Sequence, residues 1–96
     1  MTSSPIPPAV ARLCEDELHR RLPRMRAAVA QRNRASLVDD AHALRGMAGN
    51  FGLAELAQAL AALEAAARHT EEGVEEAMAE VERALVTALE TLARWR

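Results

Sequence analysis

Apolar residues recur at alternating spacings of three and four along most of this chain, which is the period of an α-helix. Beyond the first few residues, interior glycine and proline are few, and no run of β-branched or aromatic residues interrupts the pattern. A chain of 96 residues has room for one domain. The sequence therefore predicts a single domain of the all-α class.

Breaks in the apolar pattern divide the chain into four helical stretches. Connections of only a few residues join them, and short connections favour antiparallel neighbours. We therefore expect an antiparallel up-and-down four-helix bundle. The stretches are Pro8 to Gln31, the segment between Asn33 and Gly52, Leu53 to Arg68, and the segment after Thr70.

Residues at the breaks have the chemistry of helix ends. Asn33 can accept a hydrogen bond from a first-turn amide, so it is the expected N-cap of the second helix. Gly52 is the expected stop, because glycine takes the left-handed conformation at little cost. Thr70 is the expected cap of the fourth helix, where Glu71 and Glu72 would complement the positive end of the helix dipole.

Two features concern the beginning of the chain. Pro23 lies inside the first stretch, where a proline removes a hydrogen bond and clashes with the preceding turn, so we expect a kinked or split first helix. Residues 1–7 are rich in serine and proline. We expect a disordered lead-in there and the bundle over residues 8–96.

Composition excludes several classes of function. The net charge of −2 is too small for bulk attraction to nucleic acid or to an anionic membrane. The chain has one Trp, one Phe and no Tyr, so few aromatic side chains are present on which bases could stack. Cys14 is alone, which excludes an intrachain disulfide and a multi-cysteine zinc site and suggests a small buried side chain. Neither a secretory signal nor a membrane-spanning run is recognisable. We expect a cytoplasmic monomer with no metal and no bound cofactor.

The segment from Ala41 to Gly52 contains residues that an ordinary amphipathic core helix does not need. At about 100° per residue, Leu37, Ala41, Leu44 and Ala48 share a narrow buried sector. His42 lies about 130° from the centre of that sector and should face water.

Two glycines stand beside this histidine on the outward side. Gly46 and Gly49 each cost an exposed helix about 1 kcal/mol relative to alanine, yet the chain uses alanine freely elsewhere. Because glycine has no Cβ, a partner surface could approach the imidazole closely. An exposed imidazole is mostly neutral at pH 7 and nucleophilic at a ring nitrogen, and Arg45 could then hold the oxygens of a phosphoryl group placed there.

The other two histidines have ordinary surroundings. His19 lies on a polar face flanked by arginine, and His69 stands at a helix C-terminus, where a positive charge complements the dipole. We assign no chemistry to either.

The same segment resembles a known family. His42-Ala-Leu-Arg-Gly46, then Gly52, then a leucine-rich helix that ends in Leu63-Glu64, is similar to the signature of histidine phosphotransfer (HPt) domains, His-x-Leu-Lys-Gly followed by a glycine and Leu-Glu. Two departures stand out: Arg45 replaces the usual lysine and keeps the charge, and Met47 replaces the usual small polar residue.

The resemblance implies a four-helix bundle whose exposed histidine is phosphorylated on Nε2. His42 would accept a phosphoryl group from the aspartyl phosphate of one receiver domain and pass it to the aspartate of another, within a two-component phosphorelay. Arg45 would hold the phosphate, and Gly46 and Gly49 would provide clearance for docking. The receiver, as the partner, would supply Mg²⁺ and an acidic pocket. The candidate docking-face residues are Arg32, Arg34 and Val38.

Two other classes of function are alternatives. A bundle of the same origin could act as an adaptor that only binds a signalling partner, but the histidine, the cation and the glycine that transfer needs are all present. An enzyme is disfavoured, because no phosphate-binding loop, metal-ligand cluster or nucleophile with a matching base occurs. The residues after His42 also lack the acidic-then-proline pattern of kinase dimerisation helices. We therefore predict a phosphohistidine carrier without kinase or phosphatase activity.

Overall fold

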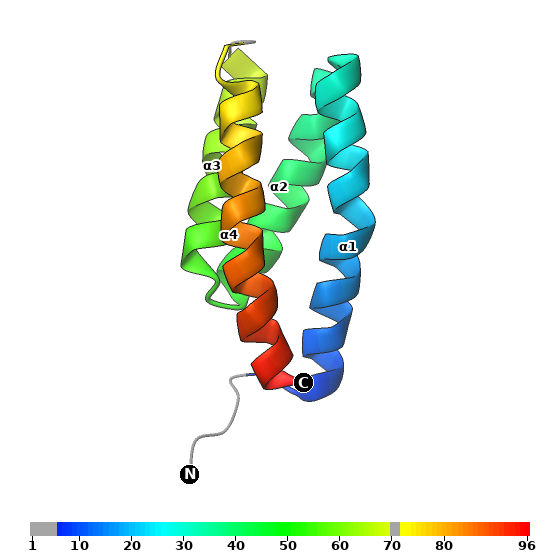
Figure 1. Ribbon diagram of the computed structural model, residues 1–96, viewed down its shortest axis with the longest axis vertical. Coiled ribbons are helices and arrows are strands. Elements are labelled where there is room, and N and C mark those ends of the chain that lie inside the picture. The colour runs from blue at the N-terminus through cyan, green and yellow to red at the C-terminus, as the bar shows by residue number, and fades with distance from the viewer. Residues whose placement is uncertain (1–5, 70–71) are drawn as a thin grey trace.

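The computed structural model describes residues 6–69 and 72–96, and within them it is entirely helical between short connections. The all-α prediction is confirmed. In Figure 1 the chain rises along α1, descends along α2, rises along α3 and descends along α4. The four helices are α1 (Pro8–Gln31), α2 (Arg34–Asn50), α3 (Ala54–His69) and α4 (Val74–Trp95).

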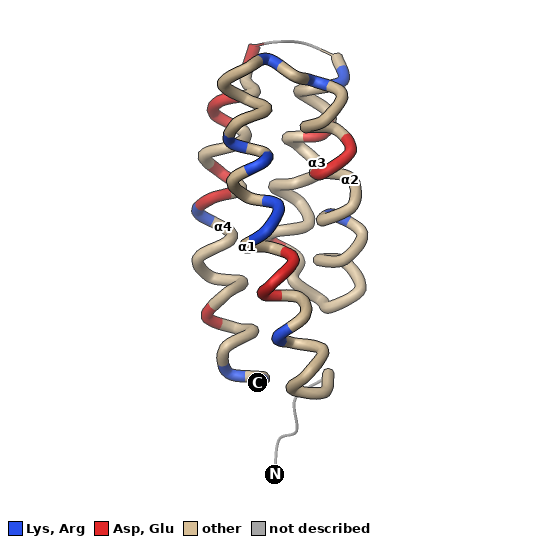
Figure 2. The backbone as a smooth tube through the Cα atoms, turned by 90° about the vertical axis from the view of Figure 1, so that its right-hand side faces the viewer, with Lys and Arg blue, Asp and Glu red and all other residues tan. Residues whose placement is uncertain are grey.

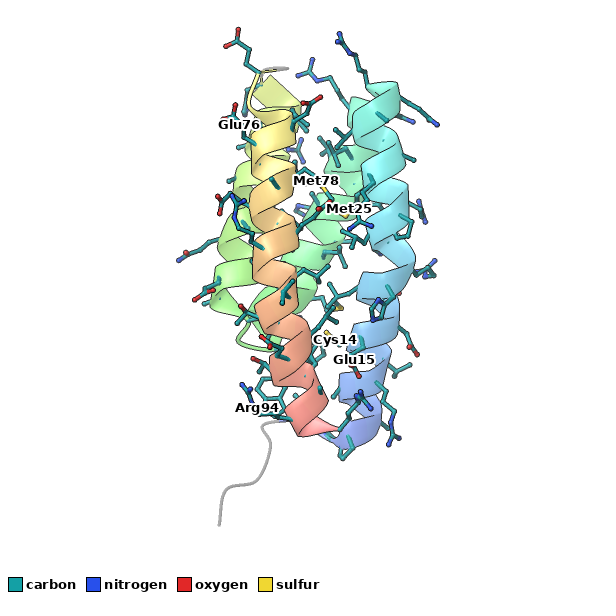
Figure 3. All side chains as sticks on the ribbon, viewed as in Figure 1. Cys14, Glu15, Met25, Glu76, Met78 and Arg94 are labelled. Carbon is teal, nitrogen blue, oxygen red and sulfur yellow. The ribbon has the colours of Figure 1, made fainter. Side chains whose placement is uncertain are left out.

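The helices pack as a ring in which each contacts two neighbours. The contacting pairs are α1 with α2, α2 with α3, α3 with α4, and α4 with α1. Cys14 and Met25 point from α1, and Met78 from α4, into the bundle (Figure 3). All four helices contribute large buried side chains to one core, among them Leu18, Leu37, Leu56, Leu60, Leu63, Val81 and Leu92.

Both ends of α2 follow the local chemistry of the sequence. The Asn33 side chain accepts a hydrogen bond from the Ser36 amide at 3.2 Å, so the predicted N-cap is confirmed. Gly52 has a φ of +72° and directly follows the C-cap Phe51. The amides of Gly52 and Leu53 bond back to the carbonyls of Gly49 and Ala48 at 3.2 and 2.9 Å, which is the Schellman pattern. The predicted stop at Gly52 is also confirmed.

One helix runs through Pro23, so the first helix is not split, while the expected kink at Pro23 stays a prediction. The buried residues Leu18 and Met25 are seven positions apart, which is two turns, so the apolar stripe stays in phase across the proline. Pro23 itself is exposed. Packing of both halves against the same core therefore keeps α1 as one element.

The start of α4 differs from the expectation. The residue that precedes the helix is Gly73, with a φ of +82°, and as a glycine it has no side chain with which to cap the first turn. Thr70, the expected cap, and Glu71 lie outside the described residues. The helix begins after Gly73 because that residue makes the left-handed turn, and Glu75 and Glu76 occupy its first turn.

An ion pair with one fully buried member joins α1 to α2. A guanidinium nitrogen of Arg21 lies 2.7 Å from Oδ1 of Asp40, whose side chain is 2% exposed. Arg24 Nε lies 3.7 Å from the other oxygen, Oδ2, which has no hydrogen-bond partner among the described residues. Asp40 therefore faces α1 rather than solvent.

Two observations concern the rest of the chain. Residues 1–5 of the expected lead-in lie outside the described residues, and α1 begins one residue after Pro7. None of the helices in the described part of the chain has the length and apolar character needed to cross a bilayer.

Candidate functional site

His42 projects from the outer side of α2, as the helical arithmetic predicts, and 60% of its side chain is exposed. Its neighbours Ala41 and Leu44 are buried, so the core holds this helix with the imidazole turned outward. The ring stands over the junction of α2 with α3, because its closest ionic partner, Glu64, belongs to α3.

Glu64 contacts only one of the two ring nitrogens of His42. The carboxylate oxygens lie 3.1 and 3.3 Å from Nδ1, and 7% of the Glu64 side chain is exposed. Nε2 has no hydrogen-bond partner among the described residues. The nitrogen that faces the protein is therefore Nδ1, and Nε2 is left for solvent or a partner.

Arg45 contacts both members of this pair. One terminal guanidinium nitrogen lies 3.3 Å from Oε1 of Glu64, and the other lies 3.3 Å from Nδ1 of His42. Nδ1 cannot donate to a carboxylate and accept from a guanidinium at the same time, because its one in-plane position holds either a proton or a lone pair. The shorter contact, to an ionised acceptor, favours a proton on Nδ1. In that tautomer Nε2 holds the free lone pair, through which the ring can act as a nucleophile.

Arg68 holds the same carboxylate from the other side. Its Nε and terminal nitrogen donate to Oε2 of Glu64 at 3.1 and 2.9 Å, one helical turn along α3. Burial by itself would raise the pKa of Glu64, but the hydrogen bonds from Arg68 and His42 and the charge of Arg45 together lower that pKa below its usual value. Glu64 is therefore an ionised acceptor for the Nδ1 proton at neutral pH.

The chain itself does not require glycine at the two positions beside His42. Outside the adjoining residues and the backbone of α2 itself, a Cβ built on Gly46 or Gly49 would meet no described atom within 4 Å, and both residues lie inside α2. The surface of α2 therefore has no side chain at these two positions, and the space above it is open.

The three candidate docking-face residues occupy different surroundings. Val38 is half-buried against the core. Arg34 donates from Nε to the carbonyl of Ala67 at 2.7 Å, which fastens it to the end of α3. Arg32 follows α1 with a φ of 57°, and together with Arg34 it lines an open cavity of about 270 Å³ at that end of the bundle. Arg34 and Val38 thus share α2 with His42, while Arg32 belongs to the bundle end.

The residues to which no chemistry was assigned keep ordinary positions. His19 and His69 are exposed on α1 and at the end of α3. Cys14 is buried as predicted, and burial, with the nearby charge of Glu15, raises the pKa of its thiol to about 11. Met47 is half-buried and packs against the core.

Sequence reasoning missed the roles of Glu64 and Arg68. Glu64 was noticed only as part of a motif, and Arg68 not at all. A signal was present, because Glu64 stands four residues after Leu60 and three before Ala67, on the buried face of α3. An acidic residue on an apolar stripe, with an arginine four residues later, indicates a buried carboxylate that is paired across one helical turn.

The charges of the described residues are dispersed along the helices, as Figure 2 shows for α1 and α4. No group of three or more His, Cys, Asp or Glu side chains in the described part of the chain is arranged to hold a metal ion.

Comparison with known proteins places these features in one family. The family model described as Hpt domain matches residues 9–95, which is nearly the whole chain. No curated protein and no solved structure matches the chain significantly.

Proposed function

The chain belongs to the Hpt domain family, and from that premise we propose that it carries a phosphoryl group on Nε2 of His42 between the aspartates of receiver domains. Hpt domains are phosphocarrier modules of two-component signalling. The observation that carries the proposal is the exposed imidazole whose Nδ1 is held by the buried Glu64 at 3.1 Å. This contact favours the tautomer that can attack through Nε2.

The transfer step uses few groups of this chain. The lone pair of Nε2 attacks phosphorus, the bond between phosphorus and the aspartyl oxygen of the donor breaks, and the aspartate leaves as a carboxylate with that electron pair. The imidazole ring then carries a positive charge while Nδ1 keeps its proton. The carboxylate of Glu64 stabilises that charge, and Arg45 neutralises the oxygens of the transferred group. Reversal of the step onto a second aspartate completes the relay.

The receiver domain completes the site in this proposal. It supplies Mg²⁺ and the acidic pocket, whereas the present chain supplies the nucleophile on the wall of an antiparallel bundle. The open space above Gly46 and Gly49 supports close approach of the receiver to the imidazole. Val38 and Arg34, on the same helix, border that approach.

Phosphotransfer from a receiver tests the proposal. A receiver domain carrying ³²P on its aspartate is mixed with the purified chain, and label on the chain is followed over time. We expect label on the wild type that is stable in alkali and lost in acid, as for phosphohistidine, and none on His42→Gln. His19→Gln is the matched control, because His19 is also exposed on a helix, and it should be labelled like the wild type.

Two results would overturn the proposal. They are an unlabelled wild type with every receiver of the same cell, or equal label on His42→Gln. If the unlabelled chain still bound a receiver, the adaptor alternative would be the better account.

A further inference from the structure

Arg45 cannot keep its present contacts and also hold a phosphoryl group. Its two terminal nitrogens lie 3.3 Å from Oε1 of Glu64 and 3.3 Å from Nδ1 of His42. Both contacts are on the Nδ1 side of the ring, whereas the phosphoryl group of the proposed function is on Nε2. Arg45 must therefore leave Glu64 in order to reach the phosphoryl oxygens, and its side chain is 42% exposed, so the bundle does not enclose it.

Departure of Arg45 would change the surroundings of a buried carboxylate. Glu64 has three partners, His42, Arg45 and Arg68, and its side chain is 7% exposed. A buried carboxylate that loses a cationic partner tends to take up a proton or turn toward water. Either change would remove the acceptor of the Nδ1 proton at the moment when the ring gains positive charge.

We propose that Arg68 is a positioning residue that holds Glu64 in place while Arg45 turns from that carboxylate to the phosphoryl group. Arg68 binds Oε2 through two nitrogens, whereas Arg45 lies nearest Oε1, so the bonds of Arg68 do not depend on those of Arg45. Arg68 acts on His42 only through Glu64. The inference rests on the proposed function and assigns the two arginines different tasks.

Three variants test this assignment. Arg68→Ala removes both hydrogen bonds and the charge, Arg68→Lys keeps the charge and one donor, and Arg83→Ala is the control. Arg83 is an exposed arginine of α4 that pairs only with Glu80 in the described part of the chain, so its removal changes net charge equally. Folding of each variant is checked by circular dichroism and thermal unfolding.

The readouts separate positioning from structure. In Arg68→Ala we expect the maximal rate of transfer from a phosphorylated receiver to fall roughly tenfold, with little change in the receiver concentration that gives half the maximal rate. The ¹⁵N shifts of His42 should show a smaller share of the tautomer protonated at Nδ1. Arg68→Lys should recover much of both, and Arg83→Ala should match the wild type.

The outcomes distinguish this inference from the function on which it rests. If the wild type accepts no phosphoryl group, the proposed function fails. If the wild type is active and the Arg68 variants match Arg83→Ala in rate and ¹⁵N shifts, the function stands and the inference is wrong. Should Arg68→Ala fail to fold, the comparison of Arg68→Lys with Arg68→Gln decides, because only the lysine keeps a charge at Glu64.

Discussion

At the scale of single residues, the two glycines beside His42 lower the stability of the helix that carries it. Glycine in a helix interior has more conformational freedom to lose on folding than alanine. The structure leaves open space at both Cβ positions, so no contact among the described residues requires glycine there. The clearance for a docking partner proposed above would be a benefit that offsets this loss.

Alanine at these positions should raise stability and lower function. We expect Gly46→Ala and Gly49→Ala each to raise the free energy of unfolding by about 1 kcal/mol, measured by urea denaturation. The same variants should accept the phosphoryl group more slowly from a receiver, because a methyl group occupies the approach. A transfer rate equal to that of the wild type would contradict the clearance role.

Gly52 provides the matched control for these substitutions. Its Cβ would also meet open space, but its φ of +72° is a left-handed conformation that alanine adopts with strain. Gly52→Ala should therefore lower the free energy of unfolding by about 1 kcal/mol.

The sequence predicted where His42 points but not which residue it meets. The outward direction depends only on the period of one helix, and the core residues of α2 define that period. The contact with Glu64 spans 22 positions, so it depends on how α2 and α3 are aligned along their lengths. The periodicity of each helix leaves this alignment undetermined, which is why the roles of Glu64 and Arg68 came from the structure.

At the scale of elements, α1 and α2 are joined by the pair between Arg21 and Asp40. The carboxylate is almost completely buried, and its second oxygen has no hydrogen-bond partner among the described residues, with Arg24 Nε 3.7 Å away. Such a pair is worth little compared with apolar packing, but loss of one partner leaves a buried charge.

A double-mutant cycle should show this asymmetry. We expect Arg21→Met to lower the free energy of unfolding by about 3 kcal/mol, because Asp40 stays buried without its main partner. The variant that combines Arg21→Met with Asp40→Leu should recover most of that loss. Chemical denaturation of the four proteins measures the coupling energy.

Arg20 is the control for this cycle. It is exposed and pairs only with Glu17 among the described residues. Arg20→Met should change the free energy of unfolding by less than about 1 kcal/mol. Similar losses for Arg20→Met and Arg21→Met would contradict the importance of burial.

The ends of elements were predictable where one side chain decides them. Asn33 and Gly52 act through their own hydrogen bond or conformation, so the sequence revealed both. Arg32 takes the left-handed conformation after α1 with a φ of 57°, although an arginine gives no sign of it in the sequence. The continuity of α1 through Pro23 likewise depends on the core contacts of both halves of the helix.

At the scale of the whole molecule, Glu64 links the stability of the bundle to pH. Its pKa is lower in the folded chain than the ordinary value, so the unfolded chain takes up a proton more readily. The stabilisation is therefore fully present above the ordinary pKa of glutamate, about 4.3, and is lost as the pH falls through the lower folded value.

Comparison with Glu64→Gln should isolate this contribution. We expect the variant to be less stable than the wild type at neutral pH, since it removes the charge that Arg45 and Arg68 face. The difference in the free energy of unfolding between the two proteins should narrow as the pH falls below about 4.3. At that pH the wild-type carboxylate takes up a proton in the unfolded chain before it does so in the folded chain, which favours unfolding. Urea unfolding at a series of pH values measures the gap. A gap that is the same at pH 7 and pH 3 would contradict the assignment.

The number of helices followed from the sequence, whereas their contacts did not. Apolar stripes and short connections were enough to predict a four-helix domain. The apolar pattern of each helix does not determine its axial alignment with its neighbours. The packing of core residues such as Leu56 and Leu60 determines that alignment. The ring of contacts is therefore a finding of the structure.

In that ring the residues of the His42 site lie on one side of the molecule only. His42 and Arg45 belong to α2, and Glu64 and Arg68 belong to α3, while α1 and α4 meet on the side across the ring. A tether, a fluorophore or a fused domain anchored on the outer surface of α4 would leave the imidazole uncovered. The α4 side is therefore the place to attach a reporter for following the proposed phosphotransfer.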